Sequence, residues 1–232
     1  ANKNRLQILK TIKMKEYHKI QTVFHRSPES NYKQLMEGVF ALPEFELLKD
    51  IEWTWTEKID GTNIRIIWDG FNVRFGGKTD NAQIPTFLLK VLQDTFTPEK
   101  MGQQFGKGFN EKDEKINVCL YGEGFGAKIQ KGGNYMPNRT DFILFDCKVD
   151  TWWLTRESIE GIATKLELQI VPIIGKGKLL DAVEFVKRGY KSTIAENKEY
   201  IAEGLIMKPS VELFNRKGER IISKIKYRDF QR

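Results

Sequence analysis

Cysteine and histidine are scarce in this chain, and long apolar runs are missing from it. The 232 residues include two cysteines, Cys119 and Cys147, and two histidines, His18 and His25. Both cysteines lie in apolar stretches, so we expect buried, reduced thiols rather than a disulfide framework. The histidines lack the spacing of a zinc site and are expected at the surface. No run approaches the roughly 20 apolar residues that a membrane helix needs.

The N-terminal 20 residues are interrupted by charges and carry no small-residue cleavage pattern, so we expect neither a secretion signal nor an anchor. We therefore expect a cytoplasmic protein, in the host cytoplasm if the chain is viral. A hydrophobic content of 40% allows a sizeable core. It is consistent with one domain over residues 1–232, on which residues 1–50 pack as a helical and extended segment.

Basic residues outnumber acidic ones, with 38 Lys and Arg against 31 Asp and Glu, which gives a net charge of +7. A basic surface suits a polyanionic partner such as a nucleic acid or a nucleotide. This observation is weak by itself, because many basic proteins bind neither.

Strand patterns dominate the chain from residue 51 onward. Residues 51–59 alternate Trp53 and Trp55 with polar side chains, as a half-buried strand does. Asp69-Gly70 lies between two further apolar segments and indicates a hairpin turn. Other strand-like segments occur at 116–126, 141–149, 151–154, 202–209 and 220–227. The tryptophans, including Trp152 and Trp153, are expected in core and sheet packing.

Three segments have helical periodicity, at 84–96, 155–168 and 178–190. Thr155 is the expected N-cap of the second segment, and the third should end near Gly189. The glycine-rich and charged residues 101–115 indicate a loop. Together the patterns predict an α+β fold built mainly from antiparallel sheets flanked by helices.

Residues 57–65, EKIDGTNIR, place a lysine at the end of an apolar strand and before a turn. A solvated lysine explains this stretch, and so does a nucleophile. A nucleophilic amine must lose its proton, although a free lysine has a pKa of about 10.4, and nearby cations or burial lower that value. Lys224 and Lys226 are two residues apart, so a strand would point both to one face. If that face meets Lys58, it would both lower the pKa of that amine and hold a phosphate.

Five short motifs occur in order between residues 57 and 226. They are KIDG at 58–61, YGEG at 121–124, FD at 145–146, EGLIMK at 203–208 and KIK at 224–226. This set resembles the covalent nucleotidyltransferase superfamily, which comprises ATP-dependent DNA ligases, RNA ligases and mRNA capping enzymes. The resemblance implies a nucleotidyltransferase domain with an ATP-grasp-like ligase fold. Six residues follow Lys226, so we expect no further C-terminal OB or helical domain.

Two positions make the chain most similar to RNA ligases of the phage type that seal double strands. Asn63 follows Lys58 by five residues, where DNA ligases and capping enzymes usually carry Arg, and Glu57 directly precedes the lysine. Lys78 stands where that group usually has an arginine that contacts nucleic acid. Lysine supplies a point charge rather than a bidentate fork. The resemblance implies an ATP-dependent RNA ligase that acts as a monomer on RNA ends.

The resemblance also implies a role for each motif residue. Lys58 would attack the α-phosphorus of ATP and hold AMP as a phosphoramidate, pass the AMP to a 5′-phosphate end, and allow a 3′-hydroxyl to seal that end. Mg²⁺ or Mn²⁺ would bind at Glu203. The other nucleotide contacts would be Glu57 at the adenine edge, Asn63 at metal or phosphate, Glu123 at the ribose, Phe145 stacked on adenine, Lys208 at phosphate, and Lys224 and Lys226 at the α-phosphate. Nucleic-acid contacts would come from Arg65, Arg74 and Lys78.

Three alternatives stay open at this point. The chain could be a minimal ATP-dependent DNA ligase or a GTP-using capping enzyme, since both share the motifs. It could also be a nucleic-acid-binding module that retains the fold without catalysis. Formation of a lysyl-nucleotide separates this last alternative from the enzymes.

Overall fold

The computed structural model describes residues 16–106 and 116–231, and their strands form two main sheets. The first sheet has the order β1 (Gln21–Thr22), β13 (Ser223–Lys226), β12 (Gly204–Pro209), β4 (Trp53–Glu57) and β11 (Ile173–Gly177). The second has the order β10 (Gln169–Ile170), β8 (Thr140–Val149), β7 (Val118–Gly126), β5 (Thr62–Trp68) and β6 (Val73–Gly76), and β9 (Trp152–Trp153) pairs with β8. A small hairpin joins β2 (Phe24–Arg26) to β3 (Leu35–Phe40).

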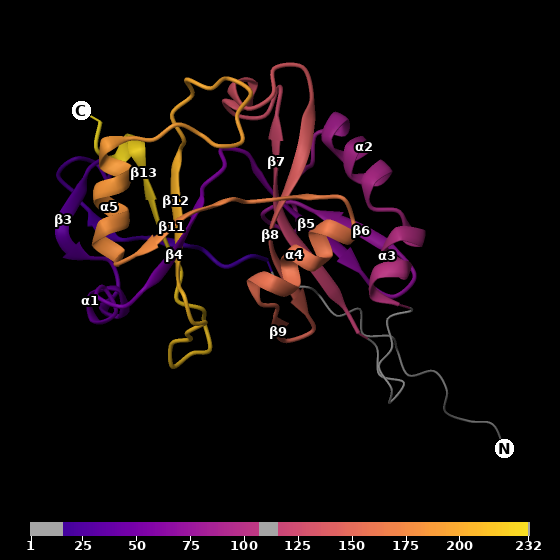
Figure 1. The fold of residues 1–232 in the computed structure, drawn as a ribbon, viewed down its shortest axis with the longest axis horizontal. Coiled ribbons are helices and arrows are strands. Elements are labelled where there is room, and N and C mark those ends of the chain that lie inside the picture. Colours follow the sequence, from indigo (N-terminus) through magenta and orange to yellow (C-terminus); the bar gives the residue numbers. More distant parts are fainter. Residues whose placement is uncertain (1–15, 107–115, 232) are drawn as a thin grey trace.

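Nearly all neighbouring strands are antiparallel, and the β1–β13 and β10–β8 pairs are parallel. Figure 1 shows the two sheets side by side, each covered by helices on its outer face. The first sheet packs against α1 (Pro43–Leu47) and α5 (Leu179–Arg188), and the second against α2 (Thr86–Thr95), α3 (Pro98–Phe105) and α4 (Arg156–Lys165). The predicted α+β fold with mainly antiparallel sheets is confirmed.

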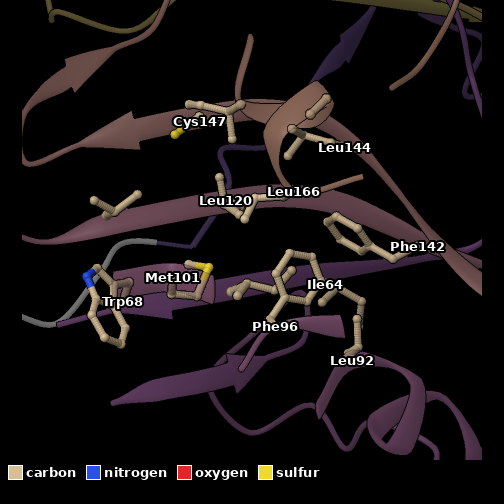
Figure 2. Packing of buried hydrophobic residues seen from close by; sticks show 14 of the residues in the cluster. Ile64, Trp68, Leu92, Phe96, Met101, Leu120, Phe142, Leu144, Cys147 and Leu166 are labelled. Atoms are coloured by element: carbon tan, nitrogen blue, oxygen red, sulfur yellow. The ribbon is translucent and has the colours of Figure 1, made fainter. Parts of the chain in front are cut away.

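Each sheet has its own apolar core. On the first, Trp53 and Trp55 of β4 pack with Val183 and Val186 of α5, as the alternation in the sequence predicts. The larger core lies between the second sheet and its helices. Figure 2 shows its labelled side chains, which come from the strands and from the helices and meet in one layer. Because the helices cover these faces, the opposite faces of the two sheets remain for a site.

Two of the helix boundaries follow from their capping residues. The Thr155 side chain accepts a hydrogen bond from the Ser158 amide at 3.3 Å, which satisfies one of the free donors at the start of α4. Helix α5 ends at Gly189, whose φ of +76° suits glycine. Both caps confirm the prediction from the sequence.

The prediction of a loop from residue 101 was wrong for the part that the structure describes. Thr97 caps α3 by accepting from the Lys100 amide, Pro98 occupies the first turn, and Met101 is fully buried in the larger core. The helix therefore continues to Phe105, because the burial of Met101 outweighs the glycine in its sequence. Residues 107–115, the rest of the predicted loop, lie outside the described residues.

Several single-residue expectations also have an outcome. Cys119 and Cys147 are free and buried, as predicted. Trp152, however, is 76% exposed on β9 and does not belong to a core. His18 was expected at the surface but borders a cavity between the sheets. Within the described ranges, no helix is both long and apolar enough to cross a membrane.

Candidate active site

A cavity of about 610 Å³ lies between the two sheets. The first sheet contributes Thr54 and Thr56 of β4, Ile206 and Lys208 of β12, and Lys224 of β13. These residues alternate along their strands with side chains of the core, such as Leu205, Met207 and Ile225. Successive side chains in a strand point to opposite faces, so one face builds the core and the other builds the cavity.

Lys58 directly follows β4 and is held by backbone contacts at the cavity edge. Its amide donates to the Gly204 carbonyl oxygen at 2.9 Å, which joins the end of β4 to the start of β12. The turn that follows passes close to β7: a Cβ on Gly61 would lie 2.3 Å from the Gly124 oxygen. Glycine at position 61 is therefore required by this close approach. The Asp60 amide also donates to the Tyr135 hydroxyl at 3.1 Å.

Glu203 lies between two lysine amines. Lys58 Nζ and Lys226 Nζ are each 2.5 Å from one of its carboxylate oxygens, and all three side chains are at least four-fifths buried. Although burial opposes ionisation, the two ammonium groups hold the pKa of Glu203 below its usual value. The predicted convergence of Lys226 on Lys58 is thus present, and a carboxylate connects the two amines.

Lys224 points to the same side of β13 as Lys226 and lines the cavity. The pKa of Lys224 is lowered to about 8, mainly by burial and further by repulsion from Lys226, Lys58 and Lys78. We expected the lysine cluster to lower the pKa of Lys58. In the structure, the cationic neighbours lower the pKa of the Lys224 amine.

Asn63 and Glu123 face each other across β5 and β7 and border the same cavity. The Asn63 Oδ1 atom is buried and has no hydrogen-bond partner among the described residues. Burial raises the pKa of Glu123 to about 8, and the charge of Lys58 only partly offsets this effect. A carboxyl group that remains protonated near neutral pH can donate a hydrogen bond as well as accept one.

Phe145 and Asp146 both face the cavity side of β8, although they are consecutive in sequence. The register passes from the Tyr121–Asp146 pair directly to the Gly122–Leu144 pair, which leaves Phe145 as the extra residue of a β-bulge. Leu144 belongs to the larger core, on the opposite face of the sheet. The bulge therefore places an aromatic ring and a carboxylate side by side on the face of β8 that is opposite the core.

Asp146 is fully buried and is the centre of an ion cluster. Its Oδ2 atom accepts from Lys208 at 2.8 Å, from Arg220 at 2.7 Å and from the Tyr17 hydroxyl at 2.6 Å. Arg220 also pairs with Glu212. Lys208, the expected phosphate contact, lies on the cavity wall and is paired with Asp146. Tyr17 and Arg220 were missed, because they lie outside the recognised motifs.

The Glu57 side chain lies on the core side of β4, 1% exposed. Its carboxylate accepts from the Ser192 hydroxyl and from the amide and hydroxyl of Thr193. These contacts bind the 192–193 loop to β4, and Glu57 also borders the cavity, so its expected contact with an adenine edge stays a prediction.

The predicted nucleic-acid residues separate into two groups. Arg65 is 2% exposed, and its guanidinium donates to the Gly77 carbonyl oxygen and to Asp80 at 2.9 Å each. The expectation that Arg65 contacts nucleic acid is therefore wrong, because the side chain is sealed in by the segment after β6. Arg74 and Lys78 are exposed, and Lys78 borders the cavity.

The carboxylates of the site do not enclose a metal ion by themselves. Among the described residues, no group of three or more His, Cys, Asp or Glu side chains has the arrangement to hold one. Mg²⁺, however, commonly uses one or two protein ligands and completes its shell with water and substrate phosphates. The Glu203 carboxylate and the unpartnered Asn63 amide oxygen are hard ligands of that type, so the residues present fit such an ion.

The sequence model of the RNA ligase family matches residues 51–226, which include every motif described above. The chain belongs to the RNA ligase family. The fold is also similar to solved structures of the RNA ligase of Naegleria gruberi. A mutant of that protein with ATP and Mn is 16% identical with a TM-score of 0.59, over 92% of this chain and 59% of that one.

A second structure of the Naegleria gruberi RNA ligase, a mutant with AMP and Mn, is 17% identical with a TM-score of 0.60. It covers 91% of this chain and 57% of that one. A third, with PPi, is 18% identical with a TM-score of 0.58, over 91% and 57%. At this identity the likeness establishes the fold. This member of the RNA ligase family spans less than three-fifths of the length of those proteins.

Proposed function

We propose that this protein is an ATP-dependent RNA ligase that forms a covalent lysyl-AMP intermediate and joins 5′-phosphate to 3′-hydroxyl RNA ends. The observation that carries the proposal is the Lys58–Glu203–Lys226 cluster beside a cavity of about 610 Å³, which is a suitable size for a nucleotide. Membership of the RNA ligase family supports the choice of reaction.

Lys58 is the nucleophile. Its amine attacks the α-phosphorus of ATP, a P–N bond forms, and the bond to the pyrophosphate oxygen breaks, so pyrophosphate leaves. The amine must lose a proton for this attack, and Glu203 Oε2, at 2.5 Å, is the acceptor in contact with it. The backbone bond from Lys58 to Gly204 holds nucleophile and acceptor in register.

The remaining wall residues bind and orient the nucleotide. Phe145 presents an aromatic ring on which a purine stacks, and Glu123 offers a carboxyl group to the ribose hydroxyls. Lys224 and Lys226 provide positive charge for the α-phosphate. A Mg²⁺ or Mn²⁺ ion at Glu203 and Asn63 would offset the negative charge of the reacting phosphate.

The later steps use RNA ends. The AMP passes from Lys58 to a 5′-phosphate, and a 3′-hydroxyl then attacks that activated phosphate and releases AMP. Lys78 and Arg74, exposed at and near the cavity edge, are the proposed contacts to the RNA backbone. We further expect a monomer that acts in the cytoplasm.

The first experiment measures covalent labelling. The protein is incubated with α-³²P-labelled ATP and Mg²⁺, denatured and separated by electrophoresis. The wild type should retain label, Lys58→Ala should retain none, and Lys165→Ala, an exposed lysine on α4, should label like the wild type. Absence of label on the wild type, or undiminished label on Lys58→Ala, contradicts the proposal.

The second experiment identifies the substrate. Nicked RNA duplexes, matched nicked DNA duplexes and single-stranded RNA are each incubated with ATP or with a pre-adenylated donor. Sealing of RNA is the expected result. Preference for the DNA nick would favour a minimal DNA ligase, and labelling by GTP in place of ATP would favour a capping-type enzyme.

A further inference from the structure

The chain before β1 forms part of the cavity wall, although it precedes the family match at residues 51–226. Residues Tyr17, His18, Lys19 and Ile20 all line the cavity. Directly after them, Gln21 and Thr22 pair with β13 of the first sheet. Tyr17 itself packs on strands of the second sheet. The segment therefore connects both walls, and Figure 1 shows the indigo chain running from one sheet to the other.

The ring of Tyr17 packs against three aromatic side chains of the second sheet. Its centroid is 5.1 Å from that of Phe145 at an interplanar angle of 77°, 5.1 Å from Tyr121 and 5.7 Å from Trp153. The first of these contacts is an edge-to-face arrangement, which aromatic pairs prefer. Phe145 is the extra residue of the bulge and has no partner on β7 in the strand register. Its orientation therefore depends on side-chain contacts such as that with Tyr17.

The hydroxyl of Tyr17 reaches the other residue of the bulge. It donates to Asp146 Oδ2 at 2.6 Å, on the oxygen that also accepts from Lys208 and Arg220. The second oxygen, Oδ1, is buried without a partner within the part of the chain that the structure describes. One side chain thus contacts both consecutive residues that the bulge turns toward the cavity.

We propose that Tyr17 is a positioning residue of the nucleotide site, whose ring supports Phe145 and whose hydroxyl fixes Asp146. The inference rests on the proposed function and extends it to a segment outside the recognised motifs. Tyr17 is not placed to react with the nucleotide. Its loss should weaken the binding of ATP while the reactive group, Lys58, and its partners remain in place.

The test measures ATP affinity without chemistry. Calorimetric titration of ATP with Mg²⁺ into Lys58→Ala protein gives a reference Kd, because that variant cannot form the covalent bond. Adding Tyr17→Ala should raise the Kd about tenfold. Adding Tyr17→Phe should raise it only about threefold, because the ring remains and Asp146 keeps its two cations. Tyr32→Ala, at a tyrosine that is 63% exposed, is the matched control and should leave the Kd unchanged.

Two further readouts distinguish positioning from a general loss of structure. With Lys58 intact, Tyr17→Ala should raise the ATP concentration for half-maximal adenylation while the maximal rate stays within about threefold. In a Phe145→Ala background, Tyr17→Ala should add less than about twofold to the Kd, because the supported ring is gone. If Tyr17→Ala does not fold, as judged by thermal melting, Tyr17→Leu is held to the same criteria.

The outcomes separate this inference from the proposed function. A wild type that forms no lysyl-AMP overturns both. A wild type that adenylates normally, with the Kd of Tyr17→Ala within about twofold of the reference, overturns the inference alone. A tighter Kd would mean that the Tyr17 ring occupies the place of the nucleotide, and an effect on the maximal rate alone would mean that it acts on chemistry; either result also overturns it.

Discussion

The protonation of Glu123 predicts a pH dependence of stability that a single substitution should remove. The pKa of this carboxyl is raised from 4.5 to about 8, first by burial, with the charges of Glu203 and Asp60 adding to the effect and those of Lys58 and Lys226 opposing it. Between these pH values the folded protein holds a proton that the unfolded chain releases. The contribution of Glu123 to stability is therefore greatest below about pH 4.5 and is lost as the pH rises toward 8.

The magnitude follows from the two pKa values. Each pH unit of difference corresponds to about 1.4 kcal/mol, so the full interval corresponds to roughly 5 kcal/mol. Glu123 borders the cavity, and screening by solvent reduces this to roughly 2–3 kcal/mol. Glu123→Gln keeps the shape of the side chain and cannot ionise. The variant should match the wild type near pH 5 and exceed its stability by roughly 2–3 kcal/mol at pH 8.

The assay is urea and thermal unfolding of both proteins at half-unit steps from pH 5 to 8.5. For a chain of this size, the expected gain at pH 8 corresponds to an increase in Tm of roughly 4–12 °C. Subtracting the wild-type stability at each pH from that of the variant removes the contributions of all other titrating groups. Glu184→Gln, at an exposed glutamate on α5, is the control and should show a difference that does not change with pH. A constant difference for Glu123→Gln, or a wild type that becomes the more stable protein at high pH, would refute the reasoning.

Two further predictions concern the backbone and the ion cluster. Gly204→Ala would place a Cβ 2.0 Å from the Ile225 oxygen. It should therefore lower the free energy of unfolding in urea by roughly 1–3 kcal/mol and, by displacing Glu203, slow adenylation at least about tenfold. Gly161→Ala on α4, where a Cβ would have nothing within 4 Å, should instead stabilise the protein by roughly 0.5–1 kcal/mol. Asp146→Asn leaves buried cations without their carboxylate and should cost about 3 kcal/mol in the same assay, and an unchanged midpoint would show that the cluster is not stabilising.

The part of the site around Lys58 was well predicted from the sequence, because strand alternation and turn residues depend on neighbours in the chain. Lys224 and Lys226 share a face by strand alternation, and Gly61 marks a turn that only glycine allows at that distance from β7. What the alternation could not supply was the partner of each amine. Glu203 lies between Lys58 and Lys226 because the Gly204 carbonyl joins two strands that are about 145 residues apart in sequence, and such pairing is set by the whole fold.

The other end of the site could not be predicted for the same reason. Phe145 and Asp146 face one side together because of a bulge, and an apolar strand pattern does not reveal which residue is the extra one. Arg65 resembled a nucleic-acid contact by position, but the chain after β6 folds over it. Tyr17 is a single aromatic residue in a charged segment, and only the fold brings it to Asp146.

The bulge in β8 also constrains how the protein can vary. Strand β8 supplies the larger core on one face and the cavity on the other, and the two halves of the strand keep opposite phases on either side of Phe145. Deleting the extra residue, Phe145, would restore regular alternation, which keeps Leu144 and Cys147 in the core and leaves Asp146 alone on the opposite face. Homologues that shorten this strand by one residue at the bulge should therefore lack the aromatic ring of Phe145 while keeping the carboxylate of Asp146 on the same face.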